Sequence, residues 1–273
     1  MGIGCNAVGV TGCRIIDSKR ERLIAMLTNS LMPCNGRFPT LIAMITLFLA
    51  SGVSRCRTLL SAAMLLGMIS VSIFATLAVS WVLSKTILRG APSSFTLELP
   101  PYRPPEVGRV IVRSVLDRTL FVLGRAVAVA APAGLILWVL ANLSLGGQSF
   151  LLMLAHTLDP IGRVFGMDGA ILLAFILALP ANEIAIPIVL MIYTGGGALV
   201  EYSSLEALGE LLCANGWSIT TALCVAVFTL FHFPCSTTLL TIKKESGKWR
   251  WAILGALLPT VLGLAICFLI ALF

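Results

Sequence analysis

The sequence predicts an all-α, polytopic membrane protein with broken or re-entrant helices. Of its 273 residues 58% are hydrophobic and 11% charged, and the mean hydropathy is +1.01. No water-soluble domain combines these values. The run Ala170–Gly197 has the length and apolarity of a membrane span, but it contains Pro180 and Pro187. Because proline removes a helix hydrogen bond, we expect both residues to interrupt this helix.

Two polar residues lie between these prolines. Asn182 precedes Glu183, which is the one formally charged residue from Ala170 to Val200. An intramembrane carboxylate costs roughly 2.5–3.5 kcal/mol on insertion scales, so it normally faces a cavity, a partner or an ion. Transporters place cation sites at interrupted helices. We therefore expect an ion path here. The alternative is a structural kink in which Glu183 pairs with a buried Arg or Lys.

Other apolar runs predict further membrane elements. These uncharged runs are Gly2–Cys13, Phe38–Ser54, Thr58–Leu83, Ala126–His156, Leu211–Ile242 and Trp251–Phe273. The first is too short to span a bilayer, so we expect half of an element whose partner is missing upstream. Within the fourth we expect one span and a short half-helix, Phe150–Leu158, ended by Asp159-Pro160. Pro234 should break the fifth run.

The charged segments predict the orientation. Segments 14–37, 84–125 and 243–250 are basic, so we expect them in the cytoplasm, and the acidic segment 199–217 outside. This arrangement also accounts for the net charge of +7 without a nucleic-acid partner. The predicted orientation requires an odd number of membrane crossings between the basic segment 84–125 and the acidic segment 199–217. One element between residues 126 and 198 must then be re-entrant or a short crossing, and the sequence leaves open which.

An amphipathic helix is predicted after the proline-rich residues 100–105. Its apolar face comprises Val107, Val110, Ile111 and Val115, and its charged face Glu106, Arg109, Arg113 and Asp117. This pattern fits a helix in the membrane interface. A solvated helix packed on the protein fits equally well.

Two of the eight cysteines lie in similar motifs. GCNAVGVTGCR at Gly4–Arg14 resembles PCSTTLLTIKK at Pro234–Lys244: Gly or Pro, then Cys, a small polar residue, an apolar stretch, and a basic residue nine positions after the Cys. Internally duplicated transporters carry such related elements at their substrate site. No CxxC pair occurs, so we expect no structural zinc site.

The predicted metal ligands are Cys5, Asn182, Glu183 and Cys235. Thiolate, carboxylate and amide oxygen together suit a borderline divalent transition metal, whereas Ca²⁺ or Mg²⁺ would require oxygen ligands throughout. Zinc, iron(II) and manganese are not separated by ligand type. His232 could add an imidazole, although a histidine in such a place is more often packed or hydrogen-bonded.

Five motifs carry a resemblance to a known family. In order they are GIGCNAVGVTGCRIIDSKRERL, PCNGRFP, ELPPYRPP, ALPANEI and FPCSTTLLTIKKESGKWRW. Over essentially its whole length the chain resembles the C-terminal part of the membrane domain of bacterial ferrous iron transport protein B (FeoB). The resemblance implies an Fe²⁺ permease with Gate (nucleoside-recognition) domains in the cytoplasmic (inner) membrane. Residues 1–118 would hold the end of the first Gate motif, two spans and the cytoplasmic amphipathic segment. Residues 119–273 would form the second Gate domain with the C-terminal span.

The resemblance also assigns residues. Cys5 and Cys235 match the two gate cysteines, and Glu183 matches the acidic residue of the usual AKE motif. Asn182 stands where the family commonly has Lys, and His232 where Tyr is common. The family's GTPase motifs, GxxxxGK[ST], DxxG and NKxD, are absent, so this chain holds no nucleotide site. We expect a separate or missing GTPase and first-gate segment as partner.

The leading hypothesis is therefore the membrane part of a ferrous iron transporter, with membrane lipid as a second partner. The alternatives are a Gate-domain protein that acts through partners, similar to spore-maturation proteins, and a nucleoside carrier. Association into a homo-oligomer stays open. We do not expect an enzyme, because no nucleophile–base pair or cofactor fingerprint occurs.

Overall fold

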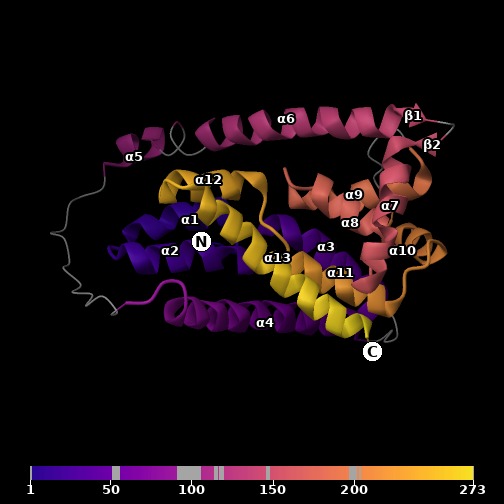
Figure 1. Cartoon of the computed structure of the whole chain (residues 1–273), viewed down its shortest axis with the longest axis horizontal. Helices are drawn as coiled ribbons and strands as arrows, with labels where there is room; N and C mark the ends of the chain where they lie inside the picture. The colour runs from indigo at the N-terminus through magenta and orange to yellow at the C-terminus, as the bar shows by residue number, and fades with distance from the viewer. Residues whose placement is uncertain are drawn as a thin grey trace.

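The computed structural model describes residues 2–50, 56–90, 106–113, 116, 120–145, 148–196, 202 and 204–272. The elongated molecule is a bundle of helices (Figure 1). Helices α1, α2 and α12 lie at one end of the long axis, and α7, α10 and a small hairpin lie at the other. Helices α2 and α12, which carry basic residues of segments 14–37 and 243–250, lie at the first end, and α10, with Glu206 and Glu210 of the acidic segment, lies at the second. This arrangement agrees with the predicted orientation, although Glu201 lies outside the described residues.

The N-terminal half contains short helices and one long one. In chain order they are α1 (Asn6–Gly12), a 3-10 turn (Cys13–Ile15), α2 (Lys19–Thr28), 3-10 turns at Asn29–Leu31 and Asn35–Arg37, α3 (Phe38–Met44), a π-helical turn (Ile45–Leu49), α4 (Arg57–Lys85) and α5 (Val107–Arg113). Ser18 caps α2 by accepting a hydrogen bond from the backbone N–H of Glu21.

The C-terminal half contains two further long helices and several broken ones. They are α6 (Phe121–Asn142), antiparallel strands β1 (Ser144–Leu145) and β2 (Gln148–Ser149), α7 (Phe150–Val164), α8 (Gly169–Leu177), a 3-10 turn (Asn182–Ile184), α9 (Ala185–Thr194), α10 (Leu205–Ala214), α11 (Ile219–Phe231), α12 (Ser236–Ser246) and α13 (Trp249–Ala271).

Several stretches are long and apolar enough to cross a membrane. Within the described residues these are Arg57–Lys85, Ile219–Ser246 and Trp249–Ala271. The prediction of a helical membrane protein is thus confirmed, as are the break at Pro234 and the span in 58–83. Of the predicted run Phe38–Ser54, the described residues form α3 and the π-helical turn, and residues 51–54 lie outside the described residues.

Within residues 126–198, the geometry favours a re-entrant hairpin formed by α8 and α9. Helices α7 and α8 are bent by 108° at the residues between them. Helices α8 and α9 pack against each other in Figure 1, and they have nine and ten residues. At 1.5 Å per residue each reaches only about half of the ~30 Å hydrocarbon core. These lengths fit a re-entrant hairpin formed by α8 and α9, and α6 is then the one crossing that the predicted orientation requires.

Two expectations about prolines were wrong. Pro187 does not interrupt a helix, because it occupies the first turn of α9, where a backbone N–H has no helical acceptor to lose. Asp159-Pro160 does not end a half-helix, because α7 continues to Val164 with Pro160 inside it. Asp159 instead stabilises the start of α8, because its Oδ1 accepts a hydrogen bond of 2.7 Å from the backbone N–H of Gly169.

The amphipathic helix is only partly described. α5 exists, and its apolar residues Val107 and Ile111 are exposed, at 61% and 57%. Exposed apolar side chains fit the interfacial helix better than one packed on the protein. Residues 100–105, Val115 and Asp117 lie outside the described residues.

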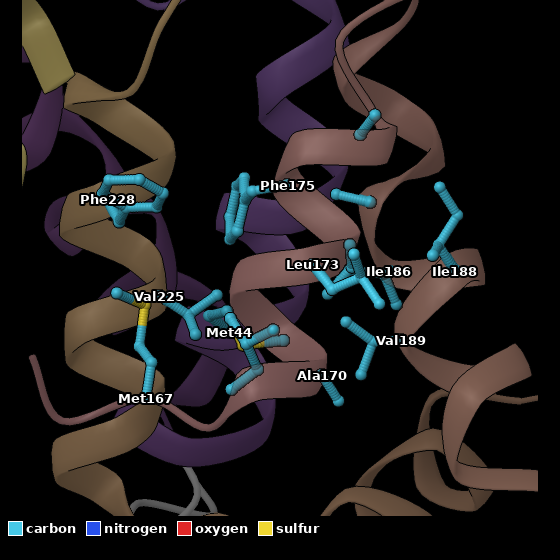
Figure 2. Packing of buried hydrophobic residues seen from close by; sticks show 14 of the residues in the cluster. Met44, Met167, Ala170, Leu173, Phe175, Ile186, Ile188, Val189, Val225 and Phe228 are labelled. Carbon is cyan, nitrogen blue, oxygen red and sulfur yellow. The ribbon is translucent and has the colours of Figure 1, made fainter. Parts of the chain in front are cut away.

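The core lies towards the outer half, where α8, α9, α11 and α3 meet (Figure 2). The Phe175 and Phe228 rings pack edge to face, with centroids 4.9 Å apart. Trp217 Nε1 donates a hydrogen bond of 2.8 Å to the Tyr193 hydroxyl, which in turn bonds Asp168 at the start of α8. The hairpin is therefore tied down at its outer end and packed along its length.

Gly169→Ala tests the close crossing of α7 and α8. A Cβ at Gly169 would lie 1.9 Å from the carbonyl oxygen of Ala155, which is backbone and cannot turn away. We expect the free energy of unfolding to fall by about 3 kcal/mol or more, at the upper end of overpacking effects. Thermal unfolding of the purified protein in detergent measures it. The control Gly134→Ala, with nothing within 4 Å on α6, should be neutral or stabilising. Equal midpoints for the two variants would contradict the crossing.

Candidate functional site

Four chain discontinuities meet near the middle of the bundle. They are the α1 start (Gly4-Cys5), break A (Pro33–Arg37), break B (Ala178–Glu183) and break C (His232–Cys235). Break B lies between α8 and α9, each of which spans about half of the hydrocarbon core. Beyond break C, α12 has 11 residues, or ~16 Å. From these lengths we infer that the discontinuities lie near mid-membrane depth, where freed backbone groups need partners other than lipid.

Hydrogen bonds and close contacts join these four segments to one another. The backbone N–H of Asn35 in break A donates to the carbonyl of Gly4 at 3.2 Å. The Glu183 carboxylate of break B lies against Gly36 of break A, since a Cβ there would be 2.6 Å from Oε2. The backbone N–H of Ser236, directly after break C, donates to the carbonyl of Leu179 at 2.8 Å. The four segments thus form one connected region.

Arg37 supplies the hydrogen bonds that the helix breaks remove. Its side chain is fully buried. Its guanidinium donates to the carbonyls of Ser30 (3.0 Å), Leu230 (2.8 Å) and His232 (2.9 Å). In a continuous helix the Leu230 carbonyl would accept from residue 234, but Pro234 has no N–H. Arg37 therefore satisfies the C-terminal end of α11 with a donor from break A, and its charge complements the helix dipole there.

A chain of polar side chains crosses from break C to break A. His232 Nδ1 lies 3.1 and 3.0 Å from the carbonyls of Phe228 and Thr229, so Nδ1 carries a proton. His232 Nε2 faces the amide of Asn182 at 3.3 Å, and the other end of that amide faces the Cys34 thiol at 4.0 Å. The oxygen and nitrogen of an amide exchange by a half-turn, which lets the amide donate to a neutral imidazole.

His232 is therefore a packed, hydrogen-bonded histidine, which confirms the more ordinary interpretation of this residue. It is 1% exposed, and the rings of Phe175, Phe228 and Phe233 surround it, with centroids 5.0, 5.8 and 5.3 Å away. Both ring nitrogens already face protein groups, so the imidazole has no nitrogen left for a metal.

Cys5 and Cys235 occupy equivalent positions. Each is the N-cap residue of a short helix, α1 or α12, and neither thiol makes a capping hydrogen bond. The two helices pack side by side, and Arg14 and Glu245 form an ion pair of 2.6 Å at the ends remote from the cysteines. The two helices are therefore parallel. Cys5 is exposed, whereas Cys235 is half-buried with Sγ 3.3 Å from Thr238 Oγ1.

Glu183 and Asn182 differ in exposure. Asn182 is buried, while the side chain of Glu183 is exposed. In the described part of the chain no lysine or arginine pairs with Glu183, and the buried cation beside it, Arg37, bonds carbonyls instead. The structural-kink alternative is thus not what the geometry shows. An exposed carboxylate at mid-depth requires water or an ion.

The predicted ligands do not form a closed site. Among the described residues no three His, Cys, Asp or Glu side chains are grouped so that they could hold a metal ion. The roles of Cys5, Asn182, Glu183 and Cys235 therefore stay a prediction. Sequence reasoning missed Cys34 and Arg37. The signal was present, because Pro33-Cys34 repeats the dipeptide Pro234-Cys235.

Two family models match the chain. "Ferrous iron transport protein B C terminus" matches residues 65–117, and "Nucleoside recognition" (Gate) matches residues 123–249. The chain matches the C-terminal membrane part of FeoB. The resemblance drawn from the five motifs is thereby confirmed, and the chain is a multi-pass protein of the inner membrane.

Curated relatives of FeoB type extend over almost the whole chain. The Fe(2+) transporter FeoB of Methanocaldococcus jannaschii is 25% identical over 99% of this chain, and that of Staphylococcus aureus 26% over 98%. The Fe(2+) transport protein A/FeoB fusion protein of Porphyromonas gingivalis is 24% identical over 99%. The chain spans 36–40% of the length of these relatives. No solved structure matches.

Arg37→Met tests whether the hydrogen bonds from the Arg37 guanidinium to the backbone carbonyls stabilise this FeoB-like chain. The change leaves three buried carbonyls without their donor, at about 1–3 kcal/mol for each unsatisfied group. We expect the free energy of unfolding to fall by about 3 kcal/mol or more. The readouts are the thermal midpoint in detergent and the yield of folded protein. The matched control is Arg57→Met, because Arg57 is exposed and donates to the Thr46 carbonyl at 2.7 Å. If Arg37→Met lowers the thermal midpoint no more than Arg57→Met does, the stabilising role of the Arg37 hydrogen bonds is refuted.

Proposed function

We propose that this chain forms the ion-conducting membrane part of a ferrous iron transporter. The observation that carries the proposal is the meeting of four discontinuities at mid-depth, where two uncapped cysteines and an exposed carboxylate lie on connected segments. The relatives' name, Fe(2+) transporter, supports Fe²⁺ as the transported ion. The chain acts as a permease and not as an enzyme. The nucleotide-hydrolysing segment of the assembled transporter is expected outside these 273 residues.

The local chemistry suits a dehydrated Fe²⁺ ion in transit. Thiolates of Cys5 and Cys235 and the Glu183 carboxylate offer mixed sulfur and oxygen ligands for a borderline metal. Cys235 is the N-cap residue of α12, and its thiol makes no capping hydrogen bond. Arg37 already occupies the freed carbonyls of α11, so the side chains, rather than this stretch of backbone, are left to bind the ion.

Fe²⁺ binding to the purified chain is the direct test. A ligand that binds the folded state raises its stability by about 2.7 kcal/mol at a hundredfold excess over Kd. In lipid nanodiscs without oxygen, we expect Fe²⁺ to raise the thermal midpoint, and Mg²⁺ and uridine to leave it unchanged. Cys235→Ser should remove most of the Fe²⁺ effect. A shift with uridine and none with Fe²⁺ would favour the nucleoside carrier, the alternative that the "Nucleoside recognition" match suggests.

Glu183→Gln separates ion binding from a structural role. The change keeps the shape and removes the charge, so we expect weaker Fe²⁺ binding with normal or slightly higher folded yield. Gly36→Ala should act similarly, because its methyl group displaces the flexible end of Glu183 while the charge stays. Gly67→Ala on α4, with nothing within 4 Å, is the matched control. Unchanged Fe²⁺ affinity in both Glu183→Gln and Gly36→Ala would remove Glu183 from the path.

A further inference from the structure

Two buried polar side chains near the gate cysteines have no hydrogen-bond partner. Among the described residues, the buried side-chain nitrogen and oxygen atoms in this state are Asn6 Nδ2, Asn6 Oδ1, Arg22 Nε, Arg37 Nε and Ser236 Oγ. The arginines have further nitrogens, and those of Arg37 are bonded. Asn6 and Ser236 differ, because their side chains make no bond at all. They are only 2% and 8% exposed.

These two residues occupy the same place in the two cysteine motifs. Asn6 directly follows Cys5 and is the first residue of α1, while Ser236 directly follows Cys235 and is the first residue of α12. A buried polar group without a partner costs about 1–3 kcal/mol, so native proteins keep few of them. Two such groups directly after the two cysteines are therefore the observation that calls for a ligand.

The two helix starts also lie at the same level. Arg14 is nine positions after Cys5, and Glu245 is ten positions after Cys235. Because Arg14 and Glu245 touch at 2.6 Å and the helices pack together, their starts are level to about one turn, ~5.4 Å. Breaks A and B connect the same two starts, through the Asn35–Gly4 and Ser236–Leu179 hydrogen bonds.

We propose that the Asn6 amide oxygen and the Ser236 hydroxyl coordinate the divalent cation beside the two thiols. This inference rests on the proposed function and extends its ligand set by two neutral oxygens. Neutral oxygen ligands replace water around the ion without adding charge, so the ion is held weakly enough to leave again. Together with Cys5 and Cys235 they give a mixed sulfur and oxygen site, which suits Fe²⁺ better than Mg²⁺ or Cu⁺.

The test relies on two opposite effects: removing either polar group should preserve or raise stability without metal, and should weaken Fe²⁺ binding. Asn6→Leu and Ser236→Ala each replace a buried unpaired polar group by an apolar one. Without metal we expect their thermal midpoints to equal or exceed that of the parent chain. Their Fe²⁺ affinity, from anaerobic titration in nanodiscs, should fall about 10- to 100-fold, as when support for a metal site is lost. Ser236→Cys and Asn6→Asp keep a ligand atom and should retain binding.

Matched controls lie far from the helix starts. Ser70 on α4 and Asn215 after α10 each bond a carbonyl of their own segment, at 2.9 and 2.8 Å. Ser70→Ala and Asn215→Leu should leave the Fe²⁺ affinity unchanged. If Asn6→Leu does not fold, Asn6→Ala replaces it in the same comparison.

Two outcomes overturn the inference, and they differ in what they say about the proposed function. If Asn6→Leu and Ser236→Ala lower the midpoint and keep the parent Fe²⁺ affinity, while Cys235→Ser loses binding, both residues are structural and the proposed function stands. If Cys235→Ser also binds Fe²⁺ as the parent does, or the parent binds none, the proposed function fails as well.

Discussion

The helix breaks of this protein depend on one buried arginine. A broken helix exposes carbonyl oxygens that lipid cannot satisfy, and at mid-depth each one needs a donor from the protein. Arg37 donates to three buried carbonyls, on Ser30, Leu230 and His232, and at 3.5 Å also to the carbonyl of Phe233. Because Arg37 belongs to break A and two of the acceptors to the end of α11, the same residue also holds the two halves of the chain together.

With the carbonyls of α11 satisfied, the other polar groups nearby are free for a different task. Asn182 links His232 to Cys34, which fixes break B against breaks A and C. Glu183 then stays exposed beside Gly36. A rigid polar frame with an exposed carboxylate and uncapped thiols at its edge is the arrangement that the proposed ion path requires.

The packed hairpin of α8 and α9 gives this frame its position. Its outer end is fixed by the close crossing at Gly169 and by the bonds of Asp168 and Tyr193. Its inner end carries break B. The apolar contacts between α8, α9 and α11 therefore set the depth at which Asn182 and Glu183 lie (Figure 2).

The sequence alone determined the class of the protein and two of the places where its helices break. Composition, apolar runs and the charge asymmetry predicted the spans, the orientation and the breaks at Pro180 and Pro234, because these follow from local residue chemistry and the membrane as solvent. Helix position, however, decides what a proline does, so Pro160 and Pro187 were misjudged.

Only the tertiary structure decided which segment is re-entrant and which groups meet. The 108° bend after α7 depends on the approach of Gly169 to Ala155, a contact that no sequence period records. The roles of Arg37 and Cys34 depend on contacts between residues nearly two hundred or about one hundred and fifty positions apart. The polar residues of the membrane interior could be identified from the sequence, but their hydrogen-bond partners depend on how distant helices pack.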